Sequence, residues 1–203
     1  MSPEDVATFE RCISVGGVAL FPADTVYGLA TEPDSREGFD RLYALKGRPP
    51  LRPSAVMFFQ RELALSALPE LGPRTRAVFE RLLPGPVTLL VPNPGGRFPL
   101  ACGPDRQRLG IRVPALTGAL EPLAAARWPV LQSSANPSGG TDARRLEEVD
   151  ARIRAGVDLQ LDGGELPGTP STVIDLAAYE EDGSYAIVRQ GALSGGDVAA
   201  RLA

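Results

Sequence analysis

Small hydroxyl, amide and glycine residues gather in the segment LQSSANPSGG, residues 131–140. The apolar run ending at Leu131 predicts a buried strand, and Ser134, Asn136 and Ser138 then provide hydrogen-bond donors and acceptors. The glycines let the backbone approach a ligand closely. The same residue types are also those of ordinary turns. Taken alone, the segment indicates either a ligand-binding loop or a turn.

Basic side chains stand at the ends of other apolar runs, in the segments LYALKGRPP, LGIRVP and AIVRQGAL; they are Lys46, Arg48, Arg52, Arg112 and Arg189. Arginine can hold a phosphate or carboxylate through two parallel hydrogen bonds, whereas lysine acts as a point charge. An isolated arginine is usually solvated surface charge. Arg112, however, lies between Ile111 and Val113, so on a strand its side chain points opposite to two apolar neighbours. The pattern therefore favours a site for anions.

Composition excludes several kinds of chemistry. The chain has no histidine, which removes Ser-His-Asp hydrolysis, Cys-His proteolysis and histidine zinc sites. Neither a GxxxxGK[ST] loop nor a GxGxxG fingerprint is present. Cys12 and Cys102 are too few for a metal cluster or a disulfide framework, so we expect free thiols and no metal site built from protein residues. The net charge of −4 argues against an extended nucleic-acid surface but is compatible with a local basic cavity for an anionic small molecule.

Helix signals place two of the basic residues. Ser2, followed by proline and two acids, predicts a helix from Ser2 to about Val15. A second helix is expected from Ser35 to Gly47, with apolar residues at helical spacing and a glycine stop. Lys46 and Arg48 then lie around the C-terminal end of that helix.

The rest of the chain alternates helix and strand patterns. Further helices are expected over residues 73–83, 118–127, 143–154 and 197–202, and strands at VALFP, SAVMFF, VTLLVP, LGIRVP, DLQLDG, STVIDL and YAIVRQG. Several strands follow one another without a helix between them, which excludes a purely parallel, doubly wound sheet. We therefore expect an α+β fold, a mixed twisted β-sheet flanked by helices, in a single domain over residues 1–203. No run approaches the roughly 20 apolar residues of a membrane span, and the acidic N-terminus is unlike a signal peptide, so we expect a soluble cytoplasmic protein without membrane contact.

Six segments occur in a characteristic order, and together they resemble the threonylcarbamoyl-AMP synthase family. They are FPADTVYGLA, LYALKGRPP, LGIRVP, LQSSANPSGG, TPSTVIDL and AIVRQGAL. Each is weak evidence alone, but the ordered set is specific and covers the chain from about Val18 to Leu193.

The resemblance implies an enzyme, a nucleotidyltransferase that makes L-threonylcarbamoyl-AMP and pyrophosphate from L-threonine, bicarbonate or CO2, and ATP, for tRNA modification. It also implies a downstream tRNA threonylcarbamoyl transferase as partner, and it leaves direct tRNA contact open. Mg²⁺ is expected to arrive with ATP, held by the phosphates.

The site residues that the resemblance implies fall into three groups. Lys46 and Arg48 are assigned to catalysis. Nucleotide binding is assigned to Arg48, Arg52, Ser134, Asn136, Ser138 and Arg189. Threonine binding is assigned to Thr25, Tyr27, Arg112 and Ser171, with Arg112 meeting the carboxylate.

Two residues depart from the family pattern. Arg52 stands where many relatives have a small polar residue, and Met57 stands where many have a histidine near the amino acid. Met57 bears on threonine recognition more than on nucleotide binding, because a thioether accepts hydrogen bonds only weakly. Asp24 is assigned no role.

Alternative interpretations remain. Thr25 can be a β-branched strand residue and Tyr27 a core aromatic. The chain can be a non-catalytic nucleotide- or RNA-binding paralogue. Carbamoyl transfer, as in hydrogenase-maturation proteins with a related domain, is disfavoured because those proteins carry acylphosphatase and zinc-finger modules for which this chain lacks the length and the cysteines.

Overall fold

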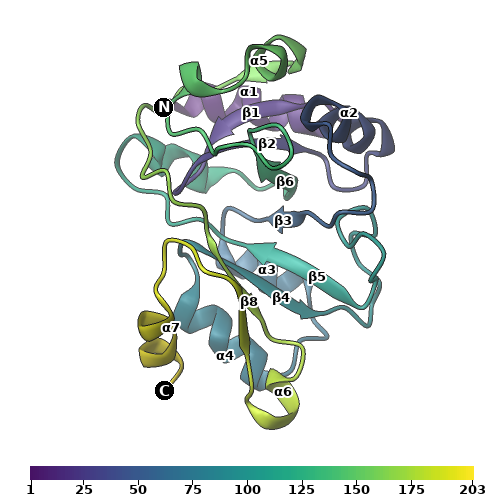
Figure 1. Cartoon of the computed structure of the whole chain (residues 1–203), viewed down its shortest axis with the longest axis vertical. Helices are drawn as coiled ribbons and strands as arrows, with labels where there is room; N and C mark the ends of the chain where they lie inside the picture. Colours follow the sequence, from purple (N-terminus) through teal and green to yellow (C-terminus); the bar gives the residue numbers. More distant parts are fainter.

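Strands from the whole chain form one mixed sheet in the computed structural model, which describes residues 1–203. The strand order is β7-β1-β2-β6-β3-β5-β4-β8-β9 (Figure 1). The strands are β1 (Ala19–Pro22), β2 (Tyr27–Thr31), β3 (Ala55–Met57), β4 (Val87–Pro92), β5 (Arg108–Arg112), β6 (Val130–Ser134), β7 (Leu159–Gln160), β8 (Thr172–Asp175) and β9 (Ala186–Arg189). Three pairs, β1–β7, β3–β5 and β4–β8, are parallel and the others antiparallel, which confirms the predicted mixed sheet.

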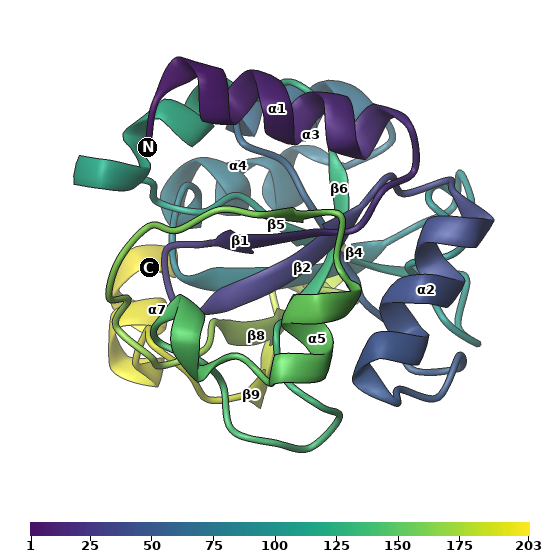
Figure 2. The ribbon, with the colours of Figure 1, turned by 90° about the horizontal axis from the view of Figure 1, so that it is seen from above.

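Helices flank this sheet on both sides. They are α1 (Pro3–Ser14), α2 (Arg36–Lys46), α3 (Arg61–Ala67), α4 (Pro73–Leu82), α5 (Ala151–Gly156), α6 (Tyr179–Asp182) and α7 (Gly195–Leu202), with 3₁₀ turns η1 (Gly118–Ala125) and η2 (Leu146–Glu148). Figure 2 shows α1 on one side of β1 and β2, and α2 and α5 on the other. No helix is long and apolar enough to span a bilayer.

The caps that were predicted from sequence form as expected. The Ser2 hydroxyl accepts a hydrogen bond from the Asp5 amide, and the Asp5 carboxylate accepts one from the Ser2 amide, so α1 begins with a capping box. At the start of α2 the Ser35 hydroxyl accepts a hydrogen bond from the Gly38 amide, and Gly47 ends the helix in the left-handed conformation with φ of 56°. The end of α2, which carries Lys46, is therefore defined by local sequence.

Two predicted helices differ from the structure. Residues 118–125 form a 3₁₀ turn and not an α-helix, and this turn contains Pro122, which has no amide hydrogen for the α-helical pattern. The helix expected over residues 143–154 is divided into η2 and α5, because Asp150 caps the Arg152 amide and starts a new helix there. Helices α3 and α6 were not predicted.

The hairpin between β1 and β2 carries two polar residues at its tip. The register runs from Ala19–Ala30 to Pro22–Tyr27, so Asp24 and Thr25 occupy the connecting turn. Thr25 is buried, and its carbonyl accepts a hydrogen bond from the Gly168 amide. The turn is thereby held against the rest of the molecule and cannot present these side chains freely to solvent.

Candidate active site

A cavity of about 490 Å³ lies on one face of the sheet, a size ordinary for small-molecule sites. A row of register partners forms its floor, in which Ala55 is paired with both Gly110 and Gln132, and Gly110 with Leu90. A Cβ atom on Gly110 would lie 3.4 Å from the Cα of Ala55. Small residues at the centre of the row therefore keep the hollow open.

Five of the predicted site residues line this cavity, and they are Arg48, Arg112, Ser134, Ser171 and Arg189. Lys46, Asn136 and Thr25 lie directly behind the lining, each bonded to it or to its backbone. Arg52, Tyr27 and Ser138 are not part of the lining. The structure thus brings together residues from the β1–β2 turn, the end of α2, β5, β6 and the loop after it, the segment just before β8, and β9.

Lys46 holds the loop that follows β6. Its ammonium donates to the carbonyl oxygen of Ser134, to that of Asn136 at 2.6 Å, and to the Asn136 Oδ1 at 3.1 Å. The Asn136 Nδ2 donates to the Gly140 carbonyl at 2.5 Å, and the Ser134 Oγ donates to the Asn136 Oδ1 at 2.6 Å. Burial, and then the nearby charge of Arg48, lowers the pKa of Lys46 to about 8. Lys46 is therefore both the anchor of this loop and a cation that an incoming anion would stabilise.

Arg112, at the end of β5, is fixed from the β1–β2 turn. Its Nη2 donates to the Asp24 Oδ1 at 2.5 Å and to the Thr25 Oγ1 at 2.5 Å, and the side chains of Arg112 and Asp24 are only 4% and 5% exposed. The Nε is buried without a partner. Sequence reasoning assigned Asp24 no role, although it directly precedes Thr25. A buried guanidinium requires a nearby negative charge. This requirement is the signal in the sequence that could have identified an acidic partner for Arg112.

Arg189 and Ser171 form a second polar group on β9 and just before β8. The Arg189 Nη2 donates to the Ser171 carbonyl at 2.7 Å and to its Oγ at 3.2 Å. The Ser171 Oγ also lies 2.9 Å from the Thr88 Oγ1. Thr88 was not predicted, but in VTLLVP it alternates with buried apolar residues, and strand alternation places its side chain on the cavity face.

Arg48 and its neighbour Arg52 behave differently. Arg48 lines the cavity, donates to the Pro53 carbonyl at 2.6 Å, and lies over the Tyr43 ring at 5.6 Å. Arg52 is exposed and outside the lining, and its carbonyl accepts a hydrogen bond from the Tyr43 hydroxyl. Its predicted contact with nucleotide stays a prediction, and this placement does not support it.

Tyr27 lies in the core with its hydroxyl turned to the loop after β7. That hydroxyl lies 2.9 Å from both the Asp162 Oδ1 and the Gly164 carbonyl oxygen, which share its single hydrogen, and it accepts from the Gly163 amide at 3.0 Å. Burial raises the pKa of Tyr27 to about 12. Its hydroxyl is thus fully used inside the protein, as expected for the core-aromatic alternative, and its predicted role toward threonine has no support from this geometry.

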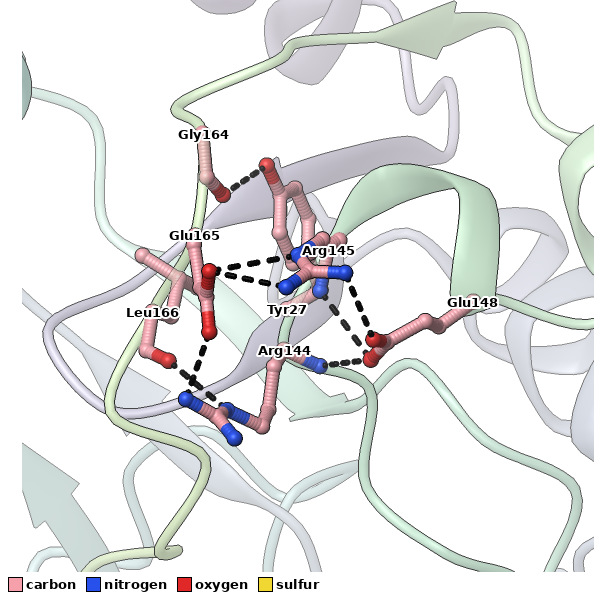
Figure 3. A network of polar contacts seen from close by, with 7 residues as sticks. All are labelled: Tyr27, Arg144, Arg145, Glu148, Gly164, Glu165 and Leu166. Atoms are coloured by element: carbon pink, nitrogen blue, oxygen red, sulfur yellow. Dashed lines mark hydrogen bonds and ion pairs between the residues drawn. The ribbon is translucent and has the colours of Figure 1, made fainter.

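The same region carries a network of charged side chains that joins two loops. Figure 3 shows Arg144 and Arg145 both reaching Glu165, at 2.6 and 2.9 Å, while Glu148 accepts from the Arg144 amide at 2.8 Å. These side chains are about half exposed, so each ion pair alone contributes little stability. The network connects the loop after Asn136 to the loop before Ser171, which are the two loops that lead into the cavity.

Met57 and Ser138 complete the predicted set. Met57 is fully buried in an apolar cluster with Phe9 and Phe21, although it is the register partner of Arg112. Ser138 is exposed, and its amide donates to the Lys46 carbonyl at 2.8 Å. Ser138 therefore contributes its backbone to the loop geometry, while its predicted contact with nucleotide stays untested.

The donor set of the cavity does not form a resident metal site. No group of three or more acidic or cysteine side chains could hold a metal ion, and Asp105 is the single carboxylate in the lining. The charge of the lining comes from Arg48, Arg108, Arg112 and Arg189. The arrangement suits anionic ligands, and any divalent cation would depend on a ligand that brings most of its own oxygen donors.

The chain is similar to proteins of known family. The chain matches the Sua5_yciO_yrdC family, described as telomere recombination, over residues 11–191. It is 33% identical over 167 residues to the threonylcarbamoyl-AMP synthase of Hahella chejuensis, a match that covers 81% of this chain and 90% of the relative. It is 30% identical over 171 residues to the protein of the same name from Pyrococcus abyssi, covering 82% of this chain and 49% of the relative.

Solved structures share the fold. The P. abyssi Sua5 structure complexed with L-threonine aligns with a TM-score of 0.85 at 25% identity, covering 99% of this chain and 58% of that chain. The structure of E. coli YciO aligns with a TM-score of 0.74 at 24% identity, covering 94% of this chain and 90% of that chain. This chain therefore spans most of the length of some relatives and about half of the P. abyssi protein.

Proposed function

Because this chain belongs to the Sua5_yciO_yrdC family, we propose that it synthesises L-threonylcarbamoyl-AMP and pyrophosphate from L-threonine, bicarbonate or CO2, and ATP. The curated relatives named threonylcarbamoyl-AMP synthase support the reaction, and the threonine complex of a structural neighbour supports the amino-acid substrate. The product would supply a downstream transferase that modifies tRNA, and we propose that the protein works in the cytoplasm.

The observation that carries this proposal is the distribution of cations around the cavity. Arg112 is paired with Asp24, whereas Arg48 and Arg189 line the cavity without a carboxylate partner within 4 Å. Lys46 stands behind this unpaired group with a lowered pKa. An amino acid with no net charge suits the paired arginine, and a polyphosphate suits the unpaired cations.

The chemistry requires positioning and charge more than a strong base. The neutral amine of threonine attacks CO2 and loses a proton, which gives a carbamate. A carbamate oxygen then attacks the α-phosphorus of ATP. The bond between the α-phosphorus and the oxygen that bridges to the β-phosphate breaks, and pyrophosphate leaves. The carbamate is already an oxyanion at this second step, so a chain without histidine can assist it through cations that stabilise the charge on phosphorus oxygens.

The proposal gives each residue of the cavity a role toward one substrate. Arg112 holds threonine, with Thr25 bonded to it from behind the lining, while Arg48, Arg189 and Ser134 face the nucleotide, with Lys46 adding charge behind them. The resemblance assigned Ser171 to threonine, but Ser171 is bonded to Arg189, and on this proposal it meets the nucleotide together with that arginine. Mg²⁺ would enter as part of the ATP complex, with its phosphate oxygens as main ligands.

Pyrophosphate release tests the proposal directly. We expect release that requires L-threonine, bicarbonate and ATP together, with threonylcarbamoyl-AMP detected by mass spectrometry. Arg48→Ala should lower the rate strongly, whereas Arg41→Ala, which removes an arginine from an ion pair with Asp158 outside the cavity, should not. ATP binding without threonine-dependent release would instead support the non-catalytic nucleotide-binding alternative.

A further inference from the structure

A buried carboxylate fixes the arginine at one end of the cavity. Asp24 accepts from the Arg112 Nη2 through Oδ1 at 2.5 Å and from the Ala115 amide through Oδ2 at 3.0 Å. Both carboxylate oxygens therefore accept hydrogen bonds from within the protein, and Asp24 is not part of the cavity lining. Asp24 acts on the cavity only through Arg112.

The bonds to Arg112 decide which of its donors a substrate can reach. Both hydrogens of Nη2 are used, one by Asp24 and one by Thr25. A guanidinium grips an anion bidentately through its Nη1/Nη2 edge or its Nε/Nη2 edge, and both edges contain Nη2. Arg112 can thus offer a single bond from Nη1, because Nε is buried and has no partner within the protein. A phosphate binds best to an arginine that has no carboxylate partner and that can donate two parallel hydrogen bonds. Arg112 has a carboxylate partner and has no edge with two free donors.

We propose that Asp24 is a positioning residue that sets the specificity of this end of the cavity, making Arg112 selective for the carboxylate of a zwitterionic amino acid and unattractive to phosphate-type anions. The inference rests on the proposed function, since it assumes that threonine binds at Arg112. The Arg112–Asp24 ion pair has no net charge, and neither does a zwitterionic amino acid. Their complex is therefore also neutral. ATP and pyrophosphate are directed to the cations at the other end.

Asp24→Asn is the variant that separates this role from a purely structural one. It preserves size and one acceptor but removes the negative charge and the two-sided hold on Arg112 and Ala115. We expect the Michaelis constant for L-threonine to rise about tenfold, as for loss of one charged hydrogen bond, while that for ATP changes by less than about twofold. Inorganic phosphate should become a competitive inhibitor against threonine, with an inhibition constant at least about tenfold lower than in the wild type.

A matched control exists on the far side of the molecule. Asp158 also accepts from an arginine, Arg41, at 2.9 Å and from a backbone amide, that of Val18, at 2.8 Å, but it does not line the cavity. Asp158→Asn should leave threonine and phosphate constants unchanged. Asp24→Glu keeps the charge and should not gain phosphate inhibition, even where its longer side chain weakens threonine binding.

Calorimetric titration with phosphate and with threonine gives a second readout that needs no turnover. Wild-type protein without threonine-dependent pyrophosphate release would overturn the proposed function and not this inference, because a gain of phosphate affinity in Asp24→Asn remains measurable. Phosphate affinity equal in wild type, Asp24→Asn and Asp158→Asn would overturn the inference. If Asp24→Asn does not fold, Asp24→Glu decides the question. A phosphate affinity above that of the wild type in Asp24→Glu would overturn the inference, whereas an unchanged phosphate affinity together with weaker threonine binding would support it.

Discussion

Lys46 and Asn136 are bonded twice, since the Lys46 ammonium donates to the main-chain oxygen of Asn136 at 2.6 Å and to its side-chain oxygen at 3.1 Å. The two residues are 90 positions apart in the sequence. The end of α2 and the loop after β6 are therefore held together at the cavity by one buried cation. The polar side chains of this loop serve the fold as well as a ligand.

Asn136→Ala should destabilise the protein more than a site residue ordinarily does. The substitution removes acceptors from Lys46 and Ser134 and a donor from the Gly140 carbonyl, in a buried location. We expect a loss of about 2 kcal/mol in the free energy of unfolding, or a melting temperature lower by roughly 4 to 8 °C. Ser134→Ala removes one side-chain bond and should cost less than about 1 kcal/mol. Thermal unfolding followed by circular dichroism measures both, with the exposed Ser138→Ala as control, and equal melting temperatures for all three would contradict the prediction.

The lowered pKa of Lys46 predicts opposite effects of pH on stability and on ATP affinity. The pKa of Lys46 is about 8 in the folded protein and ordinarily 10.5. Between these pH values the unfolded chain keeps the Lys46 proton while the folded protein has lost it, so the free energy of unfolding rises as the pH is raised from 8 to 10.5. ATP needs the charged form, so its dissociation constant should be flat below pH 8 and should then rise by up to about tenfold per pH unit. Calorimetry at several pH values tests this. Lys46→Arg keeps its charge and should flatten the curve, and a wild-type curve without a rise would remove Lys46 from the nucleotide site.

Arg189→Ala should weaken ATP binding and spare threonine. Arg189 bonds Ser171 with one nitrogen, and its remaining donors can meet phosphate at the rim of the cavity. Loss of a charge-assisted hydrogen bond costs roughly 1.5 to 3 kcal/mol, which is about a 10- to 100-fold higher dissociation constant for ATP. Arg201→Ala in α7, an exposed arginine away from the cavity lining, is the matched control. Equal ATP affinity in both variants would exclude Arg189 from the site.

Tyr27→Phe should reduce stability without a steep effect on threonine kinetics. The change leaves the Gly163 amide without its partner and removes one of the two donors to the Asp162 Oδ1, which keeps the Gly164 amide. We expect a loss of about 1 to 3 kcal/mol in the free energy of unfolding. Tyr185→Phe is the control variant, because the Tyr185 hydroxyl makes no hydrogen bond within the protein. A large rise in the Michaelis constant for threonine at unchanged stability would restore the interpretation of Tyr27 as a threonine-binding residue.

Local chemistry made part of the fold predictable. Ser2, Ser35 and Gly47 act through contacts a few residues away, so the ends of α1 and α2 follow from the sequence. The division of the region from 143 to 154 depends instead on Glu148 and Asp150 capping amides around them, which competes with a continuous helix. Strand order depends on pairings such as β3 with β6, which no local pattern specifies.

The candidate site shows the same division. Arg112 was predictable because a cation between two apolar strand residues must face away from them. Its partner Asp24 lies 88 residues away, in a turn whose position follows only from the assembled sheet. Gln132 and Gly110 could have been found by counting two residues back from Ser134 and Arg112 along each strand, since alternate residues share a face.

The strand order also sets the sequence in which the cavity is completed during translation. Asp24, Lys46, Arg112 and Ser134 have all been synthesised by the time the ribosome reaches the loop after β6, and β1, β2, β6, β3 and β5 are consecutive in the sheet. Ser171 and Arg189 follow later, at the β8–β9 edge beyond β4. A nascent chain therefore acquires Arg112 and its partner Asp24 before Arg189, and the set of cations that we propose for the nucleotide is complete only after β9 has been synthesised.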